Sequence, residues 1–323
     1  MIVAGLDEAG YGPLLGPLVV GCCAFELDDR PGDGDLPCIW KRLSRLVSKK
    51  RSASGRKIHI NDSKLVYSPS GGLKELERSV LSILCSMGPE PSSIETLLGI
   101  AASHALPDLE DYPWYQTSVD EHFPLKQDGL SIRLFANALR QEMQITQTKC
   151  VYLSARVVLE RQLNRLMIAT RNKASALFST GAIHLDHLLR AYGHRPMIIV
   201  CDRQGGREHY GGLLRLMFEE WSLEILEERD GFGDYRLSRA GNGVRIIFRE
   251  KAEVGCLSVA LASMLSKYLR EALMSRFNAY WLGHMPGVAP TAGYYNDGAR
   301  FLKDIDGKRR EMGIADFDLI RCR

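Results

Sequence analysis

An apolar run at residues 2–6 leads directly into two adjacent carboxylates, Asp7 and Glu8, and then into a glycine-rich turn. The run predicts a buried strand with the acid pair at its exit. Burying two carboxylates is unfavourable unless positive charge offsets them, and divalent cations bound by carboxylate oxygens are a common solution. Taken alone, an Asp-Glu pair is more often a capped turn on a solvated edge, so the rest of the chain must decide between the two interpretations.

The composition is that of an ordinary soluble globular protein, with 323 residues of which 45% are hydrophobic and 25% charged. A net charge of +3 permits a nucleic-acid partner without requiring one. No apolar stretch reaches the length of a membrane span, and the N-terminal run has no basic segment before it, which argues against a signal peptide. None of the eight cysteines forms a C-x-x-C pair, so zinc is disfavoured and a reducing, cytoplasmic location is expected.

Further apolar runs predict a mixed sheet. Residues 17–25 read as a second strand, antiparallel to the first. Residues 197–201 are apolar at every position and end in Asp202, which is typical of a central parallel strand covered on both faces. Additional strands are expected at 223–228 and 244–249.

Three other segments have distinct patterns. Residues 256–280 predict a long helix. Residues 88–130 contain several prolines among acidic and aromatic residues, and we interpret them as an inserted excursion with little regular structure. Residues 41–56 are rich in Lys and Arg, including Lys49-Lys50-Arg51. This basic segment is either a solvated loop or a non-specific contact for phosphates.

Four acids occupy related positions in this arrangement. Asp7, Glu8 and Asp202 end predicted strands, and Glu253 precedes the long helix. Acids at the ends of neighbouring strands and at a helix start can converge on the crevice where open α/β sheets bind ligands. Four carboxylates in one crevice would raise one another's pKa unless metal ions neutralised them. Two Mg²⁺ or Mn²⁺ ions there could promote in-line phosphoryl displacement.

The long helix has two stripes. Ser263, Lys267 and Arg270 form a polar stripe that suits phosphate binding or a solvated face. An apolar stripe comprises Leu257, Leu261, Leu265 and Leu269.

Several motifs together resemble the ribonuclease HII (type-2 ribonuclease H) family. DEAGYGPLLGP at 7–17 is similar to the family's opening D-E-A-G-R-G-P motif, and NDSKLVYSP at 61–69 resembles its D-S-K-K-L segment. VCDRQGG at 200–206 matches the strand that ends in the third acid. VALASMLSKYLREALM at 259–274 and the Gly293-Tyr294 pair correspond to the remaining blocks, in the family's order.

The resemblance implies a ribonuclease H-like α/β fold: a mixed five-stranded sheet flanked by helices, in a single domain over 1–323 with insertions near 30–60, 88–150 and 205–250. It also implies two-metal hydrolysis of the RNA strand of RNA/DNA hybrids, with Mg²⁺ or Mn²⁺ as cofactor. The implied metal ligands are Asp7, Glu8, Asp202 and Glu253. The implied substrate-binding residues are Gly10, Tyr11, Gly12, Lys64, Ser263, Lys267, Arg270 and Tyr294, with the glycine backbone reading the 2′-hydroxyl.

The sequence departs from the family pattern in ways that leave alternatives open. Tyr11 stands where the family has arginine, and Glu253 where it has aspartate. The substrate could therefore be a continuous hybrid, or else DNA or structured nucleic acid. A third possibility is a nucleic-acid-binding relative without catalysis, although retention of all four acids argues against it. No membrane partner is expected, and the oligomeric state is left open.

Overall fold

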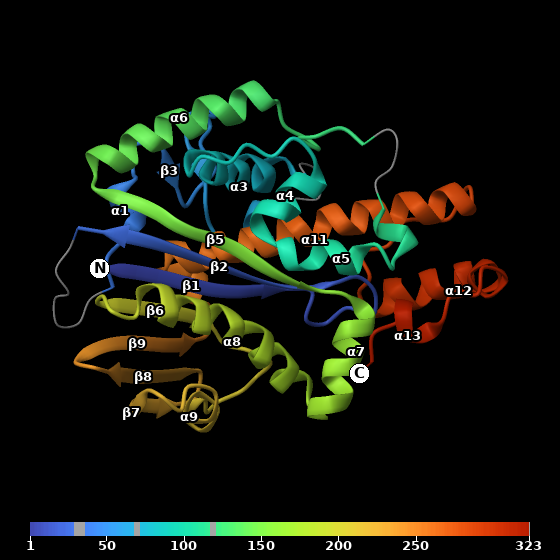
Figure 1. Cartoon of the computed structure of the whole chain (residues 1–323). Coiled ribbons are helices and arrows are strands. Elements are labelled where there is room, and N and C mark those ends of the chain that lie inside the picture. Colours follow the sequence, from blue (N-terminus) through green and yellow to red (C-terminus); the bar gives the residue numbers. More distant parts are fainter. Residues whose placement is uncertain (29–35, 68–71, 117–120, 323) are drawn as a thin grey trace.

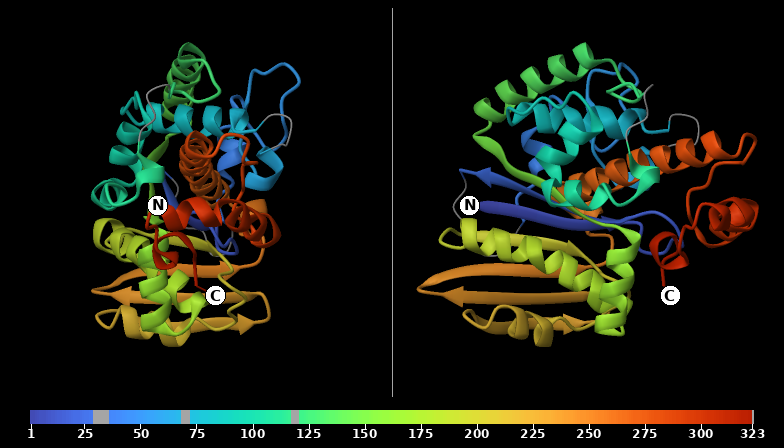
Figure 2. Two further views of the ribbon diagram at one scale, coloured as in Figure 1. Left: turned by 90° about the vertical axis from the view of Figure 1, so that its right-hand side faces the viewer. Right: turned by 45° about the vertical axis from the view of Figure 1, so that its right-hand side comes forward.

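The computed structural model describes residues 1–28, 36–67, 72–116 and 121–322 (Figure 1). The segments discussed above near 30–60, 61–69 and 88–150 therefore lie partly outside the described residues. Within the described part of the chain, a large mixed sheet forms the centre of the molecule, and helices cover both of its faces (Figures 1 and 2). The sheet is what brings the candidate site together.

The first two strands form the predicted antiparallel pair, β1 (Ile2–Ala9) and β2 (Leu18–Leu27). On its other side β1 pairs in parallel with β6 (Met197–Asp202), and β6 pairs in parallel with β9 (Asn242–Arg249). The full order is β5-β2-β1-β6-β9-β8-β7. The outer strands are β5 (Thr148–Val158), β8 (Phe232–Arg239) and β7 (Ser222–Arg229).

The α/β class and the mixed sheet are confirmed, but the sheet has seven strands where the resemblance implied five. The additional strands, β8 and β7, form an antiparallel meander beyond β9 in the segment expected as an insertion near 205–250. The strand β8 was not predicted, because its buried positions are not all apolar. One of them is Asp234, whose charge is neutralised by Arg245 at 2.7 Å.

The strand β6 is covered on both faces, as its uninterrupted apolar run predicts. Val200 packs into the core on the side of α11 (Leu257–His284), and Ile199 packs into the core on the side of α8 (Lys173–Tyr192). The apolar stripe of α11 is confirmed as well. Its members Leu257, Leu261, Leu265 and Leu269 are all buried.

The helix α11 lies almost in contact with the backbone of β1 at a glycine. A Cβ atom added to Gly5 would stand 2.2 Å from the backbone nitrogen of Val259 and 2.4 Å from the carbonyl carbon of Ser258. A hydroxyl reinforces this contact, because Ser258 Oγ donates a hydrogen bond of 3.0 Å to the carbonyl of Val3. The absence of a side chain at Gly5 therefore sets how closely α11 approaches the strand that carries the acid pair.

The prediction of little regular structure at 88–130 was wrong. This segment contains α4 (Ile94–Ala101), α5 (Leu106–Leu109) and two short 3₁₀ turns, η1 (Ser103–Ala105) and η2 (Pro113–Tyr115). Its residues Tyr112, Trp114 and Tyr115 are buried, and Trp114 packs edge-on against Phe277 of α11, with ring centroids 6.2 Å apart. Proline accordingly stands in the first turns of α5 and η2, where its missing N–H costs nothing.

The remaining elements are short or peripheral. They are α1 (Ile39–Arg42), β3 (Val47–Ser48), β4 (Ile58–His59), α2 (Ser63–Val66), α3 (Lys74–Ser86), α6 (Gly129–Ile145), α7 (Glu160–Thr170), α9 (Gly211–Met217), α10 (Ala252–Gly255), α12 (Tyr295–Glu311) and α13 (Asp316–Leu319). Among the helices of the described residues, none combines the length and the apolar character that crossing a membrane requires.

Substitution of Gly5 by alanine should test the contact between α11 and β1. The added methyl group would meet backbone atoms that cannot rotate away, so we expect a loss of about 3 kcal/mol in the free energy of unfolding. Gly243→Ala in β9 is the matched control, because nothing lies within 4 Å of its added Cβ. Urea denaturation would measure both variants. Equal midpoints for the two would contradict this account of the packing.

Candidate active site

The four predicted acids lie at the same edge of the sheet. Leu6 pairs with Cys201 across the parallel strands β1 and β6, so the next residues, Asp7 and Asp202, follow side by side. Asp202 in turn pairs with Arg249 at the end of β9. The chain then enters α10, where the backbone N–H of Ala252 donates a hydrogen bond of 2.9 Å to Asp202 Oδ1 and thereby brings α10 against the strand end.

The charges of these carboxylates act on one another's pKa values, which indicates that they lie in one neighbourhood. Burial, then the charges of Glu8 and Asp202, raise the pKa of Asp7 well above its usual value. Burial and Asp202 raise the pKa of Glu8 to about 7. Burial raises the pKa of Asp202, and burial followed by Asp202 raises that of Glu253. The sequence-based expectation that the acids converge is therefore matched by the structure, whereas their role as metal ligands stays a prediction.

The segment at 61–67 contributes charges of both signs to this cluster. The charge of Lys64 opposes the raised pKa values of Glu8, Asp202 and Glu253, so its ammonium group lies near enough to act on these carboxylates. Asp62, which the sequence reading overlooked, adds to the raised pKa values of Asp202 and Glu253. Asp62 also caps α2, because its carboxylate accepts the backbone N–H of Lys64 at 2.9 Å.

Ser263 supports the acid cluster from α11. Its buried hydroxyl lies 3.0 Å from Ser63 Oγ at the start of α2. A hydrogen bond from Ser263 also opposes the burial that raises the pKa of Asp7. The side chain therefore connects the helix, the segment at 61–67 and the first acid, and it is a positioning group more than an exposed phosphate ligand.

The glycine turn after β1 presents one exposed and one buried glycine. Gly10 has a positive φ of +85°, and an added Cβ would lie 2.5 Å from the carbonyl of Pro17. Gly12 is exposed, with nothing within 4 Å of an added Cβ. Between them, the half-buried Tyr11 lies beside the acids: burial and then Glu8 raise the pKa of its hydroxyl, whereas Arg207 lowers it.

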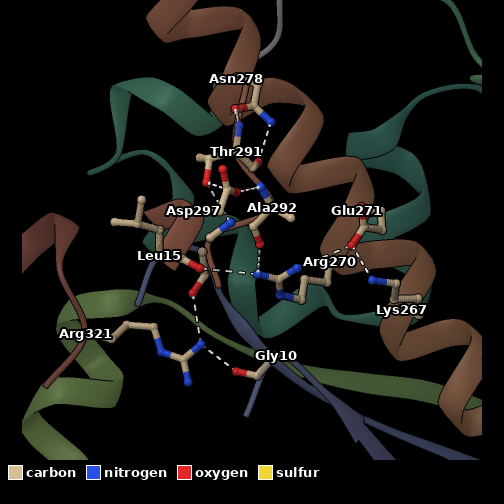
Figure 3. Close-up of polar contacts among 12 residues, drawn as sticks. Gly10, Leu15, Lys267, Arg270, Glu271, Asn278, Thr291, Ala292, Asp297 and Arg321 are labelled. Carbon is tan, nitrogen blue, oxygen red and sulfur yellow. Dashed lines mark hydrogen bonds and ion pairs between the residues drawn. The ribbon is translucent and has the colours of Figure 1, made fainter. Parts of the chain in front are cut away.

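Arg270 does not have the position that phosphate binding requires. Its side chain is 0% exposed, and its guanidinium donates hydrogen bonds to the carbonyls of Leu15 at 3.3 Å and Ala292 at 2.9 Å (Figure 3). We therefore correct the prediction for Arg270, which fastens the glycine turn to the segment before α12. Helical spacing alone cannot distinguish a guanidinium that faces carbonyl groups from one that faces solvent.

Two other residues that were predicted to bind substrate, Lys267 and Tyr294, are partly exposed. Lys267, 15% exposed, pairs with Glu271 at 2.7 Å and lies 4.9 Å above the ring of Tyr67. Tyr294 is 48% exposed, with the guanidinium carbon of Arg270 lying 5.5 Å from the centre of its ring. Tyr294 thus presents an aromatic surface to solvent from the segment that Arg270 fastens.

The residues before Tyr294 hold the glycine turn through backbone hydrogen bonds. The carbonyl of Gly293 accepts the N–H groups of Leu14 at 2.8 Å and Leu15 at 3.2 Å. Thr291 Oγ1 in turn accepts the N–H of Gly293 at 2.9 Å and donates to Asp297 at 2.6 Å (Figure 3). The turn that follows the acid pair is consequently fixed to the C-terminal part of the chain.

Arg321 is a second anchor of the turn, and no pattern in the sequence predicts it. Its guanidinium donates to the carbonyl of Gly10 (Figure 3) and to that of Tyr11, and its backbone N–H donates to the carbonyl of Leu14 at 2.9 Å. Burial, followed by the charge of Arg270, lowers the pKa of Arg321 to about 10. A lone arginine near a C-terminus belongs to no motif, so only the folded structure reveals this role.

A buried carboxylate supports the turn from the opposite side. Glu160 Oε1 accepts the N–H of Gly16 at 3.1 Å and the hydroxyl of Tyr115 at 2.6 Å. Burial raises the pKa of Glu160 to about 7, although these hydrogen bonds and the charge of Arg321 oppose the shift. The ends of the turn are thus held by one buried acid and two buried arginines.

The chemistry of the donor set suits hard divalent cations. All four strand-end and helix-start donors are carboxylates, and Glu8 Oε2 is a buried oxygen without a hydrogen-bond partner in the described part of the chain. Across the described residues, however, no three His, Cys, Asp or Glu side chains are grouped closely enough to hold a metal ion. The type and charge of the four side chains suit divalent ions, whereas their present spacing does not form a metal site.

Comparisons with known proteins give a weak likeness over the whole chain. No family model and no curated protein matches the sequence. Among solved structures, RNase HII from Archaeoglobus fulgidus, in a complex with PCNA, gives a TM-score of 0.44 at 15% identity, covering 100% of this chain and 95% of that one. Ribonuclease H2 from Pyrococcus horikoshii OT3 gives a TM-score of 0.38 at 13% identity, covering 99% of this chain and 92% of that one. Bst-RNase HIII in complex with Mn²⁺ gives 0.43 at 15% identity, covering 99% and 66%.

At TM-scores below 0.5, these likenesses do not establish what the chain does. The function has to be inferred from the residues of the site and from the motifs that carry them.

Asp7→Asn should stabilise the metal-free protein. Removing one charge relieves the repulsion from Glu8 and Asp202, while the amide oxygen can still accept the N–H of Glu8, a bond of 2.7 Å in the native protein. We expect the thermal midpoint at pH 8 to rise by about 2–4 °C for each kcal/mol of repulsion relieved. Glu219→Gln, which removes an exposed acid, is the control. A lower midpoint for Asp7→Asn would contradict the coupling of the acids.

Glu160 should make stability depend on pH in a defined window. Its pKa is higher in the folded state, about 7, than the ordinary value of 4.5, so folding takes up a proton between these values. The contribution of Glu160 to the free energy of unfolding is fully present below about pH 4.5 and is lost as pH rises to about 7. Glu160→Gln should keep the accepting oxygen and remove this dependence. We expect the variant to gain stability relative to the native protein between pH 5 and pH 8, by about 1–3 kcal/mol in urea denaturation. If the difference in free energy of unfolding between Glu160→Gln and the native protein stays constant across that range, Glu160 does not titrate there.

Proposed function

We propose that this chain is a divergent ribonuclease HII that hydrolyses the RNA strand of RNA/DNA hybrids with the help of Mg²⁺ or Mn²⁺. The observation that carries the proposal is the convergence of Asp7, Glu8, Asp202 and Glu253 at one edge of the sheet, with Lys64 among them. A half-buried cluster of mutually repelling carboxylates is costly for a protein that only binds nucleic acid. It becomes useful when divalent ions neutralise it.

The proposed metal ligands are the four acids, with the buried, unpartnered oxygen Glu8 Oε2 as the clearest candidate donor in the described residues. When bound, divalent ions would polarise the scissile phosphate and lower the pKa of the attacking water. Hydrolysis would then break the bond between phosphorus and the 3′ oxygen and leave 3′-hydroxyl and 5′-phosphate ends.

The protein's own groups would hold the substrate around this point. Lys64 is exposed and its charge acts on three of the acids, so its ammonium can meet a phosphate that enters the cluster. The exposed backbone of Gly12 can approach a sugar closely, and a 2′-hydroxyl is the group that separates RNA from DNA. The carbonyl of Gly10 instead accepts a hydrogen bond from Arg321, so the role of Gly10 is to shape the turn.

Two aromatic residues are available for the sugar or base beside the cleaved bond. Tyr294 exposes nearly half of its side chain, and Tyr11 lies next to Glu8 with Lys173 Nζ 5.1 Å from the centre of its ring. Tyr11 occupies the family's arginine position and carries one hydroxyl in place of a fork of donors. We therefore propose a continuous hybrid as the preferred substrate, in contrast to a single ribonucleotide within DNA.

Cleavage of three matched duplexes tests the proposal. We expect the full-length protein with Mg²⁺ or Mn²⁺ to cut a continuous RNA/DNA hybrid, to cut a duplex with one ribonucleotide more slowly, and to leave an all-DNA duplex intact. Asp202→Asn should lower the rate on the hybrid by about 10²–10³-fold, because it removes a charged donor from the cluster. Gel analysis of end-labelled strands would measure the rates and identify the ends.

Glu219→Gln is again the control and should retain the native rate. Cutting of the all-DNA duplex alone would favour a DNA nuclease of the same architecture. Binding without cutting of any duplex would favour a non-catalytic role, and either result would refute the proposal.

A further inference from the structure

The basic segment is a concentrated source of positive charge. Residues 41–67 contain nine Lys and Arg residues and a single acid, Asp62, although the whole chain has a net charge of only +3. The rest of the chain is therefore net acidic, and the basic character of the protein resides mainly in this one segment. A local concentration of this kind needs an explanation, because like charges on one short stretch repel each other.

The base of the segment is fixed beside the acid cluster. Lys49 Nζ donates to the carbonyl of Val254 at 2.7 Å, and Val254 directly follows Glu253 in α10. The ammonium of Lys49 also lies 4.1 Å from the centre of the Trp40 ring. The carbonyl of Lys49 contacts His59 Nε2 at 3.0 Å and accepts the side-chain amide of Asn61 at 2.9 Å. The loop that follows Lys49 therefore starts at the edge of the candidate active site.

The cations beyond Lys49 are exposed and unpaired. Lys50, Arg51 and Arg56 are exposed, and none of them has an acidic side chain within ion-pair distance among the described residues. The neighbouring acid Glu75 is already neutralised by Arg78 at 2.6 Å. Some exposed arginines elsewhere in the protein are paired. Exposed examples such as Arg190, Arg229 and Arg236 each pair with a carboxylate of their own element or of the next strand.

The composition of the loop indicates what it can recognise. Residues 49–57 read KKRSASGRK and contain no aromatic side chain on which a base could stack. The intervening Ser, Ala and Gly residues are small and allow close approach of a backbone. Lys and Arg with small neighbours suit contacts with phosphates, which are independent of nucleotide sequence.

We propose that the loop carrying Lys50, Arg51 and Arg56 binds backbone phosphates of the nucleic acid that flank the cleavage site. This inference rests on the proposed function. The cationic loop alone could bind any polyanion, and we take the partner to be a nucleic acid because the proposed nuclease site lies next to the loop. The acid cluster repels a polyanion, and the cationic loop at its edge offsets that repulsion. The loop supplies affinity for any duplex, whereas the site itself discriminates RNA from DNA.

The test compares two triple variants of the full-length protein. The loop variant carries Lys50→Ala, Arg51→Ala and Arg56→Ala. A control variant with Arg190→Ala, Arg229→Ala and Arg236→Ala changes the net charge equally on α8, β7 and β8, away from β3 (Figure 1). Fluorescence anisotropy without divalent metal measures binding to a labelled RNA/DNA hybrid and to an all-DNA duplex between 50 and 200 mM NaCl. Cleavage of the hybrid with Mg²⁺ gives kcat and KM.

We expect the loop variant to bind both duplexes at least about tenfold more weakly, with a salt dependence of log K that is shallower by about two to three. Its KM should rise while kcat stays within twofold of the native value, and the control variant should match the native protein in slope. An unchanged affinity and salt slope in the loop variant would overturn the proposal. So would a native protein that binds neither duplex.

The outcomes separate this inference from the proposed function. If the native protein cuts the hybrid and the loop variant has the native affinity and KM, the proposal for the loop is refuted and the nuclease assignment stands. If the native protein binds both duplexes through the loop but cuts neither, the loop is supported and the nuclease assignment fails.

Discussion

Repulsion among the carboxylates at the ends of β1 and β6 and in α10 is the constraint around which the rest of the structure is organised. The parallel pairing of β1 with β6 and of β6 with β9 forces Asp7, Asp202 and the chain before Glu253 to the same edge. Burial then raises the pKa of each carboxylate, and the charge of Asp202 raises those of Asp7 and Glu253 further. A cluster of this kind separates unless its supporting elements are rigid, and the contacts around it provide that rigidity. Gly5 allows α11 to approach β1 closely, and Ser263 connects α11 to both Asp7 and α2.

The turn that follows the acids is held by charged groups that do not face solvent. Arg270 and Arg321 direct their guanidinium groups to backbone carbonyls, and Glu160 accepts from a backbone N–H on the other side. Buried arginines used in this way fix a loop that has few apolar side chains to bury. They are then unavailable for phosphates. Exposed cations near the acids include Lys64 and Lys49, and the loop that begins at Lys49 carries more of them, so the basic segment matters to substrate binding in our proposal.

The apolar patterns of the sequence were sufficient to predict the elements that carry the acids. β1, β2, β6 and α11 follow from runs or stripes of apolar residues, and the edge at which Asp7 and Asp202 meet follows from the parallel pairing. Patterns failed where a buried position is polar. Asp234 in β8 is buried because Arg245 neutralises it, and the aromatic side chains after Pro113 form part of the core although their surroundings in sequence are acidic. Arg270 and Arg321 could not be assigned from sequence, because spacing does not specify whether a guanidinium meets a carbonyl or a phosphate.

The most direct test of the central claim is the location of Mn²⁺ in crystals of the native protein, determined from anomalous diffraction. If the four acids form a divalent-metal centre, Mn²⁺ should be bound by oxygens of Asp7 and Asp202, with Glu8 or Glu253 completing the site, and crystals of Asp7→Asn should show reduced occupancy there. Mn²⁺ bound only elsewhere on the protein, with these carboxylates free of metal at millimolar concentration, would contradict the account.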